Sequence, residues 1–353
     1  MPASCTHKYL ILMTCYSPNT LLVYTNKDLN KKKTRFFVGS DLNISVPPFL
    51  VDKYYRDKNS PVNVVYTLES QNTIPCGHCI GCQLDKANMW KNRLMAEYRV
   101  SKIAYFLTIT YADVFLPKNN LLCKSDIQKF AKSIKDYFLK HFGYKEIKYY
   151  IVGEYGSKSL RPHYHAIFFN LPLDLKDFSL CGINCNLIPD KDFYKCKLLD
   201  SGMSTGSKIY KCKFLDNFWS RGNIIVGSVS SSSTAYCARY CNKKLNRESD
   251  EKELLKILKV QPEFLLCSKN LGTKYIFSKN LVNNKYYDNG KLVSGGRLGL
   301  KNLAEDLQKE IKVNNQYYFS INLASRYGDK NEMLKQDSGI KSLKIKTLKR
   351  NYN

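Results

Sequence analysis

The chain has 353 residues and a formal net charge of +26 at pH 7, from 56 Lys and Arg against 30 Asp and Glu. Positive charges in such excess repel one another, so the charge favours a polyanionic partner such as a nucleic acid. A generally Lys-rich composition could also produce this charge. The hydrophobic fraction of 44% argues against general disorder, and no apolar run approaches the roughly 20 residues that a membrane-spanning helix needs.

Tyrosine and cysteine are both abundant, with 26 and 13 copies. A tyrosine can stack on an unpaired base and can bond a phosphate through its hydroxyl, so this composition also favours nucleic acid. The N-terminal residues lack the apolar core of a signal peptide, and we expect a soluble, intracellular protein. In a reducing compartment the cysteines call for an explanation other than disulfides, and an odd number cannot all pair internally.

Residues 1–104 form an N-terminal segment in this interpretation. Up to about residue 74 the sequence predicts short strands joined by basic turns. Pro75 then precedes a motif of three cysteines at equal spacing, Cys76, Cys79 and Cys82. Apolar residues at helical spacing follow the motif and predict a helix: Leu84, Ala87, Trp90, Leu94 and Tyr98.

The cysteine motif offers three soft ligands, whereas zinc normally has four. Cys5, Cys15 or His78 could supply the fourth, and we select Cys5. Reduced thiols at the start of a helix explain the motif equally well, and an iron–sulfur site is a third alternative. The candidate structural zinc ligands are Cys5, Cys76, Cys79 and Cys82.

Residues 105–249 form the folded core in this interpretation. The β-branched and aromatic run Phe106–Tyr111 predicts a strand, and an apolar stripe over residues 125–142 predicts an amphipathic helix. Short connections favour an antiparallel sheet with helices packed on one face, which is an α+β domain. Further strands are expected at 147–152, 163–170 and 223–229, with an insertion of uncertain structure at 171–216 and a helix after the last strand.

Two of the five histidines, His163 and His165, are separated by one residue in a predicted strand. Residues i and i+2 of a strand point to the same face, so the two imidazoles can bind one ion, although two histidines can also occupy a strand surface by chance. Glu154 ends the neighbouring strand, and a polar turn folds it back beside the pair. Two imidazoles and a carboxylate suit Mg²⁺ or Mn²⁺, and the same set could hold a catalytic zinc.

Tyr236 and Tyr240 stand four residues apart in a predicted helix, so their hydroxyls share one face. A phenol is mostly protonated at pH 7 and becomes a nucleophile when a metal polarises the target phosphate and cations stabilise the phenolate. Arg239 and Lys243 supply such cations. Two aromatic residues that merely pack a helix are the simpler explanation of the pair alone, but the histidine strand favours phosphoryl transfer.

Three segments now stand in order along the chain: Phe106–Tyr111, Arg161–His165 and Tyr236–Lys244. They resemble the three motifs of rolling-circle replication initiators in the His-hydrophobic-His endonuclease superfamily. The tyrosine pair with a following lysine is similar to the initiators of microviruses, which are small single-stranded DNA phages, and the cysteine motif points to the gokushovirus branch. Tyr164, between the histidines, departs from the pattern because it is only partly hydrophobic.

The resemblance implies a metal-dependent DNA nickase with strand-transfer activity. One tyrosine would attack the phosphate at the origin, keep the 5′-phosphate as an ester and free a 3′-OH for synthesis, and the other would later help to close the displaced strand into a circle. The implied partners are viral single- and double-stranded DNA and the host helicase and DNA polymerase, in the host cytoplasm and with no membrane. The implied roles are alternating nucleophiles for Tyr236 and Tyr240, phosphate or phenolate stabiliser for Lys243, and metal ligands for Glu154, His163 and His165.

Residues 250–353 form a basic C-terminal region with one predicted helix at 250–259. Two other classes of protein compete with the nickase. A non-enzymatic, zinc-stabilised DNA-binding protein would explain the charge and the cysteines but would leave the histidine and tyrosine pairs accidental. A basic packaging protein would show little periodicity, contrary to residues 84–245.

Overall fold

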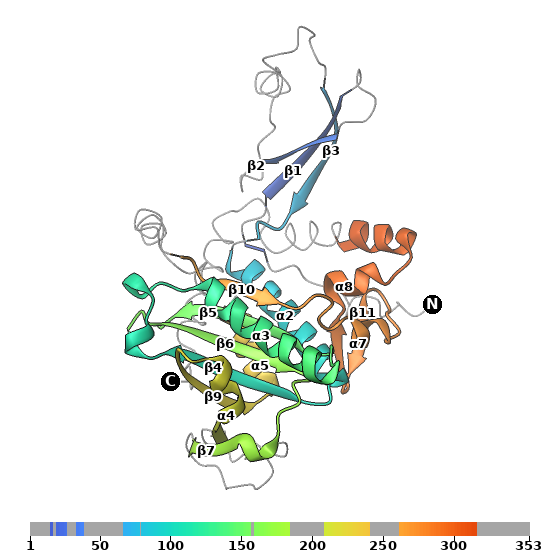
Figure 1. Cartoon of the computed structure of the whole chain (residues 1–353). Coiled ribbons are helices and arrows are strands. Elements are labelled where there is room, and N and C mark those ends of the chain that lie inside the picture. Colours follow the sequence, from blue (N-terminus) through green and yellow to red (C-terminus); the bar gives the residue numbers. More distant parts are fainter. Residues whose placement is uncertain are drawn as a thin grey trace. The chain divides into compact units, whose positions relative to one another are not determined.

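The computed structural model describes residues 15–16, 19–26, 33–38, 66–77, 79–156, 159–183, 208–240 and 261–315 (Figure 1). The chain divides into two compact units, a first unit of residues 1–85 with 303–353 and a second unit of residues 86–302. The three-part division at residues 104 and 249 was drawn from composition and stays a prediction.

The first unit contains a three-stranded antiparallel sheet with the strand order β2-β1-β3. The strands are β1 (Asn19–Asn26), β2 (Lys33–Val38) and β3 (Tyr66–Ile74). An irregularity in the pairing of β1 with β3 falls between Val23 and Tyr24, where the register shifts. The short strands predicted before residue 74 are thus confirmed in the part of this region that is described.

The second unit is built on a seven-stranded antiparallel sheet with the order β10-β5-β6-β4-β9-β8-β7. This confirms the predicted α+β class and antiparallel pairing, but three of the strands were not predicted: β7 and β8, which lie in the insertion, and β10 at the edge. The strands are β4 (Ala104–Tyr111), β5 (Lys148–Tyr155), β6 (Pro162–Phe169), β7 (Phe178–Ile183), β8 (Lys208–Cys212), β9 (Gly222–Ser228) and β10 (Phe264–Cys267).

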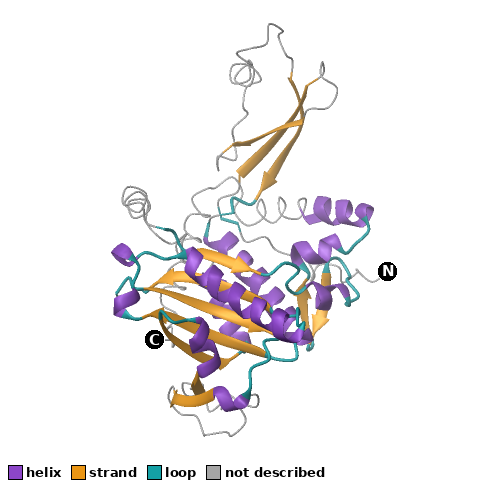
Figure 2. Ribbon diagram, in the orientation of Figure 1, coloured by secondary structure: helices purple, strands orange, loops and turns teal. Residues whose placement is uncertain are grey.

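Helices pack against both faces of this sheet, so the prediction of one covered face is wrong (Figure 2). On one face, α3 (Lys124–Phe142) and α4 (Lys213–Phe218) bury Phe130 and Leu215 against Tyr164 and Phe168 of β6. On the other face lie α2 (Ile80–Val100) and α5 (Ser231–Tyr240). Their buried residues Trp90, Leu94, Cys237 and Ala238 share a core cluster with Tyr150, Ile167 and Phe169.

The reason for the second covered face is visible in β6 itself. After His165 the strand continues as Ala166–Phe169 without a polar residue, and all four side chains are fully buried. A strand with one solvent-exposed face alternates apolar and polar residues, whereas an unbroken apolar run is typical of a strand buried on both faces. The run therefore indicated a second layer of helices.

Helix α3 confirms the predicted amphipathic helix almost residue for residue. It ends where Gly143 takes a left-handed conformation, with φ 62°, and donates its backbone N–H to the Leu139 carbonyl. A residue with a Cβ is disfavoured in that conformation, so glycine is the usual choice at a helix end. The buried residues of the stripe are Ile127, Phe130, Ala131, Ile134 and Phe138.

The second unit ends in smaller elements after β10. They are α7 (Thr273–Phe277), the hairpin of β11 (Lys285–Asp288) and β12 (Lys291–Ser294), and α8 (Gly296–Lys301). The helix predicted at 250–259 and the last part of the basic C-terminal region, residues 316–353, lie outside the described residues. Among the described helices, none combines the length and apolar character that crossing a bilayer requires.

Candidate metal and tyrosine site

The pairing of β5 with β6 places the three predicted metal ligands on one face of the sheet. Glu154 stands directly opposite His163 in the antiparallel register, and His165 follows two residues along the same strand. Directly paired residues and i, i+2 neighbours share a face, which brings all three together. β5 continues to Tyr155, beyond the end predicted at residue 152, so Glu154 lies within the strand rather than at its end.

The three side chains converge on a small volume. Glu154 Oε1 lies 2.7 Å from His163 Nε2 and 3.2 Å from His165 Nε2. The side chains of Glu154 and His165 are 3% and 8% exposed, whereas that of His163 is 19% exposed. The site is therefore buried at the carboxylate and opens toward solvent on the side of His163.

Contacts behind the imidazoles orient them. Nδ1 of His163 lies 3.1 Å from the carbonyl oxygen of Arg161, which can only accept, so Nδ1 carries the proton. Nδ1 of His165 shares a hydrogen bond of 3.2 Å with the Thr108 hydroxyl, and the ring stacks on Phe106 at 5.6 Å. With both Nδ1 atoms engaged, each Nε2 faces Glu154. It donates to the carboxylate while it is protonated, and a metal ion could take the place of that proton.

The carboxyl group of Glu154 is held in its ionised form. Burial by itself raises its pKa, but hydrogen bonds from His163 and His165 outweigh burial and lower the pKa to about 2. A buried carboxylate is therefore present across the ordinary pH range. It provides a negative charge on which a divalent cation can bind.

The donor set fits a divalent cation. One ligand atom from each of Glu154, His163 and His165 lies within 4.8 Å of the other two. Two imidazole nitrogens and one carboxylate oxygen leave coordination positions open for water or phosphate oxygens, as in catalytic sites. Mg²⁺, Mn²⁺ and Zn²⁺ all accept this combination, so the donor set defines the kind of site rather than the element.

Tyr236 reaches this site from α5. Its hydroxyl lies 3.4 Å from His165 Nε2, and its ring meets the His165 ring edge-on with 5.1 Å between centroids. It also contacts Phe106 edge-on at 6.3 Å. The structure thus brings together one predicted nucleophile and the three predicted metal ligands.

The serine run before the tyrosines explains where α5 begins. Ser233 N–H donates to the Ser230 hydroxyl, and Ser230 N–H donates to the Ser233 hydroxyl, a reciprocal cap that satisfies two free backbone donors. Cys237 and Ala238 are then fully buried against the sheet, which turns the neighbouring Tyr236 toward the histidines.

The remaining predicted nucleophile and its lysine are only partly placed. Tyr240 is the last residue of α5, one turn after Tyr236, but its side chain lies outside the described residues, as does Lys243. Their predicted roles stay predictions.

Tyr164 separates the histidines and points to the opposite face of the sheet, where it is fully buried. Its hydroxyl donates to the Cys123 carbonyl at 2.9 Å, accepts from the Cys123 N–H at 3.1 Å and lies 2.8 Å from the Tyr111 hydroxyl. The middle residue therefore belongs to the core, and its polar atom is satisfied there. The departure from a purely hydrophobic residue has a structural explanation.

Two residues contribute to the site although the sequence predicted no role for them. Thr108 holds His165, and Arg161 binds the start of β6 to the end of β4 by an ion pair with Asp113 and a hydrogen bond to the Tyr111 carbonyl. The alternation of Phe106–Tyr111 could have placed Thr108 on the same face as the histidines, once β4 was known to neighbour β6.

The predicted cysteine ligands form a separate group in the first unit. Cys76, Cys79 and Cys82 lie together, and Cys15 joins them. Cys5, which we selected as the fourth ligand, and His78 both lie outside the described residues. Cys15 was among the alternatives that the sequence left open.

The antiparallel sheet and α5 thus bring two histidines, a carboxylate and a tyrosine together at one place. Comparison with known proteins shows the family to which the chain belongs. Residues 104–245 match the family described as replication-associated protein ORF2/G2P. The chain is 33% identical over 268 residues to replication-associated protein ORF2 of Spiroplasma virus 4, a match that covers 74% of this chain and 69% of that protein. The chain therefore belongs to the family of phage replication-associated proteins, and the resemblance to microvirus replication initiators is confirmed.

Two further relatives match over shorter lengths. Replication-associated protein VP4 of Bdellovibrio phage phiMH2K is 32% identical over 180 residues, half of each chain. Replication-associated protein ORF4 of Chlamydia phage 1 is 33% identical over 96 residues, which are 27% of this chain and 24% of the relative. No solved structure matches the chain.

Proposed function

We propose that the protein initiates phage DNA replication by nicking one strand at the origin, with Tyr236 as a nucleophile that becomes covalently linked to DNA. The observation that carries the proposal is the 3.4 Å separation between the Tyr236 hydroxyl and His165 Nε2, inside a group of three metal-ligating side chains. A nucleophile beside such a group can meet a phosphate that the same ion polarises.

Glu154, His163 and His165 would hold the cation, Mg²⁺ or Mn²⁺ in this proposal. When bound, it would supply positive charge that draws electron density from a phosphodiester oxygen. Thr108 and the Arg161 carbonyl fix the orientation of the two imidazoles, and the buried carboxylate keeps the charge of the site favourable for a cation.

The transfer step exchanges one phosphoester bond for another. The Tyr236 oxygen bonds to phosphorus and loses its proton to water, while the bond from phosphorus to the 3′ oxygen of the preceding nucleotide breaks and that oxygen takes up a proton. The 5′-phosphate stays on the tyrosine and the free 3′-OH can prime synthesis. Because the ester replaces a phosphodiester of similar energy, a 3′-OH can reverse the step and reseal DNA without a nucleotide cofactor.

Tyr240 is proposed as the second nucleophile, which cleaves the regenerated origin after one round. The support is its place on α5, one helical turn after Tyr236, and the resemblance of the tyrosine pair to the microvirus motif. Lys243 is proposed to stabilise the phosphate or the phenolate from the following turn.

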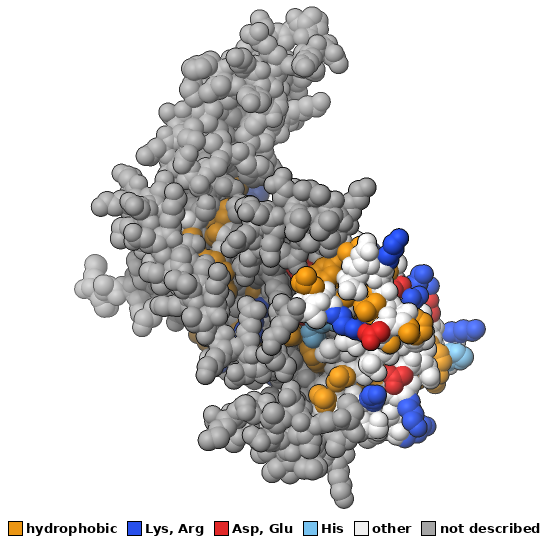
Figure 3. All heavy atoms as spheres, turned by 90° about the vertical axis from the view of Figure 1, so that its left-hand side faces the viewer, with side chains coloured by type: hydrophobic (Ala, Val, Ile, Leu, Met, Phe, Trp, Pro, Cys, Tyr) orange, Lys and Arg blue, Asp and Glu red, His pale blue; other side chains and the backbone are white. Residues whose placement is uncertain are grey.

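Viral DNA, single- and double-stranded, is the proposed partner. The net charge of +26 supports it, and in Figure 3 Lys and Arg side chains are spread over the visible part of the described surface rather than gathered into one patch. Phosphate contacts of this kind release counterions, so binding should weaken steeply with salt. Unwinding and synthesis are assigned to a host helicase and DNA polymerase in the host cytoplasm.

The test is a search for the covalent adduct. Labelled single-stranded oligonucleotides that tile the source genome are incubated with the protein and Mn²⁺ and then denatured. We expect one oligonucleotide to give an adduct that survives denaturation. Tyr236→Phe combined with Tyr240→Phe should abolish this adduct and keep DNA binding.

Tyr287→Phe is the matched control, because Tyr287 is a tyrosine of the same unit that is 64% exposed on β11. Its adduct yield should equal that of the unchanged protein. An undiminished adduct in the double variant would reject the assignment, and no adduct with any oligonucleotide would favour the non-enzymatic DNA-binding alternative.

A further inference from the structure

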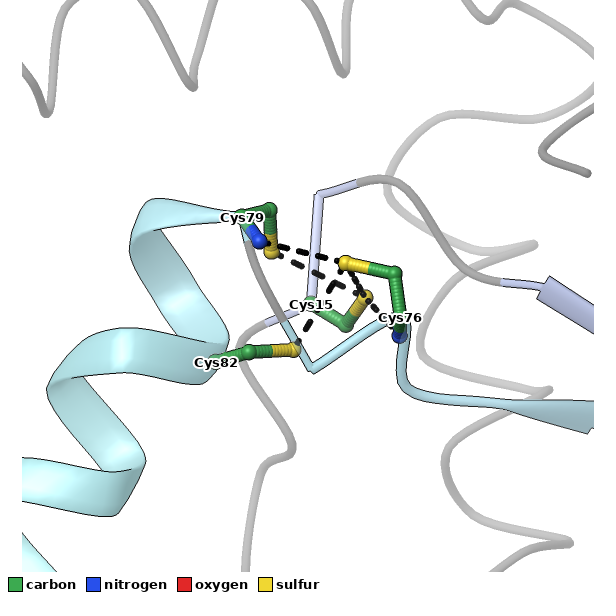
Figure 4. A group of neighbouring side chains, drawn as sticks. All are labelled: Cys15, Cys76, Cys79 and Cys82. Carbon is green, nitrogen blue, oxygen red and sulfur yellow. Dashed lines mark hydrogen bonds between the residues drawn. The ribbon is translucent and has the colours of Figure 1, made fainter. Parts of the chain in front are cut away.

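Four cysteine sulfurs meet in the first unit, far along the chain from the histidine site (Figure 4). Cys15 precedes β1, Cys76 follows β3, and Cys79 and Cys82 stand at the start of α2. The four Sγ atoms all lie within 4.8 Å of one another, and Figure 4 shows them pointing to a common centre. Two separate stretches of the chain, one at Cys15 and one from Cys76 to Cys82, thus supply one cluster.

The spacing of the sulfurs matches a tetrahedron around one ion. A zinc–sulfur distance of about 2.3 Å places tetrahedral ligands about 3.8 Å apart. The observed Sγ–Sγ distances are 3.7 Å for Cys15–Cys76, 3.8 Å for Cys15–Cys79 and 4.0 Å for Cys76–Cys82. They are well beyond the roughly 2.05 Å of a disulfide bond.

Backbone donors surround the sulfurs. Tyr16 N–H points to Cys79 Sγ at 3.2 Å, Cys76 N–H to Cys15 Sγ at 3.3 Å and Cys79 N–H to Cys76 Sγ at 3.2 Å. Such donors stabilise sulfur in its negatively charged, metal-binding form.

Gly77 makes the tight turn between the first two cysteines of the motif possible. It has φ 80°, a left-handed conformation that residues with a Cβ rarely adopt. The backbone of the motif is therefore folded around the sulfurs.

Ordinary packing of buried thiols does not explain the arrangement. Among the described residues, the cluster around Cys15 and Cys82 is completed by Cys76 and Cys79 alone, without an aliphatic or aromatic side chain. An apolar core would mix residue types. Sulfurs that all approach one another this closely also suit a single ion better than an iron–sulfur cluster, whose several irons spread the thiolates.

We propose that Cys15, Cys76, Cys79 and Cys82 bind one zinc ion as a closed, structural site. Four protein ligands leave no coordination position for a substrate, so the ion has no part in the cleavage chemistry. It joins Cys15 to residues 61 and 64 positions later and so fastens the start of β1, the end of β3 and the start of α2 to one point. Cys15 takes the place that the sequence analysis gave to Cys5.

The first test is the metal content of the full chain, purified with a thiol reductant and no chelator. We expect about one zinc per chain, as for a single four-ligand site. Cys15→Ser and Cys82→Ser should each lose most of it. Cys5→Ser and Cys267→Ser are the matched controls, and both should keep the full content.

Retained zinc in Cys15→Ser, lost zinc in Cys5→Ser, or iron in place of zinc would each overturn the proposal. His163→Ala should keep the thiolate-bound zinc, which separates this site from the histidine site. Failure of the nicking experiment would leave the zinc result untouched, since neither measurement depends on the other.

A second test uses only the unchanged protein, so it does not depend on whether a variant folds. Replacement by Co²⁺ should give the strong near-ultraviolet thiolate-to-cobalt absorption and the visible bands of a tetrahedral site. Alkylation followed by peptide mass spectrometry should find the four cysteines protected until a chelator is added. Labelling at equal rates before and after chelation, or peptides joined by disulfides, would contradict the proposal.

Discussion

The two groups of candidate ligands in this protein differ in chemistry and in openness. The cysteine group has four soft sulfur ligands that close around one point, whereas the histidine group has two imidazoles and one carboxylate, with an exposed side at His163. A closed site can only hold parts of the chain together, and an open one can also accept a phosphate and a nucleophile. The difference teaches that the number of ligands and their access to solvent, more than the presence of a metal, distinguish a candidate structural site from a candidate catalytic one.

The largest expected effect comes from removing the carboxylate of the open site. Glu154→Gln keeps the size of the side chain but removes the charge that two imidazoles share. We expect adduct formation to fall by at least about 100-fold, the upper end of what losing a partner near a metal costs. Cleavage rates at several Mn²⁺ concentrations measure it.

The control for Glu154→Gln is zinc content. The variant should keep its thiolate-bound zinc, because the two groups share no ligand. Cleavage at the rate of the unchanged protein would show that Glu154 is not needed for the reaction, and the histidine group would then no longer differ from the cysteine group in the proposed way.

The next effect is on stability and concerns the closed site. Cys15→Ser removes one of four ligands, so the binding of the ion no longer stabilises the folded state. We expect the free energy of unfolding to fall by about 2 kcal/mol. This is the stabilisation that a bound ligand gives when its concentration is well above its dissociation constant. Urea denaturation followed by circular dichroism measures the change.

Cys267→Ser serves as the comparison for this loss, since Cys267 is exposed on β10 and outside the cluster. It should change the unfolding free energy by less than about 0.5 kcal/mol, as surface substitutions usually do. Equal losses in the two variants would mean that the cluster adds no stability.

A smaller effect should follow from Thr108, which contacts His165 without being a ligand itself. Thr108→Val keeps the shape and removes the hydrogen bond, so affinity of the open site for Mn²⁺ should fall about tenfold. Thr108→Ser should restore it. A purely structural role for Thr108 would instead lower the unfolding free energy and leave the Mn²⁺ dependence of cleavage unchanged.

The last effect is absent at neutral pH and limits the pH range in which the open site can be studied. Burial, with Asp288 and Tyr275 nearby, raises the pKa of Tyr286 to about 12, above its ordinary value of 10.0. A raised pKa gives stability that is complete below pH 10 and is lost as the pH rises toward 12. We therefore expect the unfolding free energy to decline above about pH 10.

Tyr286→Phe should reduce this decline without abolishing it, because burial also raises the pKa of Tyr164 to about 12, and replacement of the exposed Tyr287 by Phe should leave the decline unchanged. Urea titrations between neutral pH and pH 12 compare the two variants. An identical alkaline decline in both would show that Tyr286 is not its source.

Much of the candidate site was predictable because it depends on short-range periodicity. Residues two apart in a strand lie on the same face, and this spacing predicted that His163 and His165 lie together. An apolar stripe at helical spacing predicted α3. Tyr236 could be suggested as a nucleophile only together with the histidine strand and the resemblance to a motif, since one tyrosine among 26 carries little information by itself.

Other features depend on which strands become neighbours. The length of β5 and the second layer of helices were mispredicted, although the apolar run Ala166–Phe169 pointed to burial on both faces. β10 was missed because a four-residue strand at a sheet edge has too short a pattern to recognise.

By itself, the sequence determined the antiparallel α+β class, the family and which side chains are candidates to bind a metal or to attack a phosphate. Only the tertiary structure decided that Glu154 stands opposite His163, that Tyr236 reaches His165 and that Cys15 completes the sulfur cluster. The physical reason is distance along the chain. Local spacing sets the direction of a side chain within its own element, whereas strand register and the return of the chain after 61 residues set which elements meet.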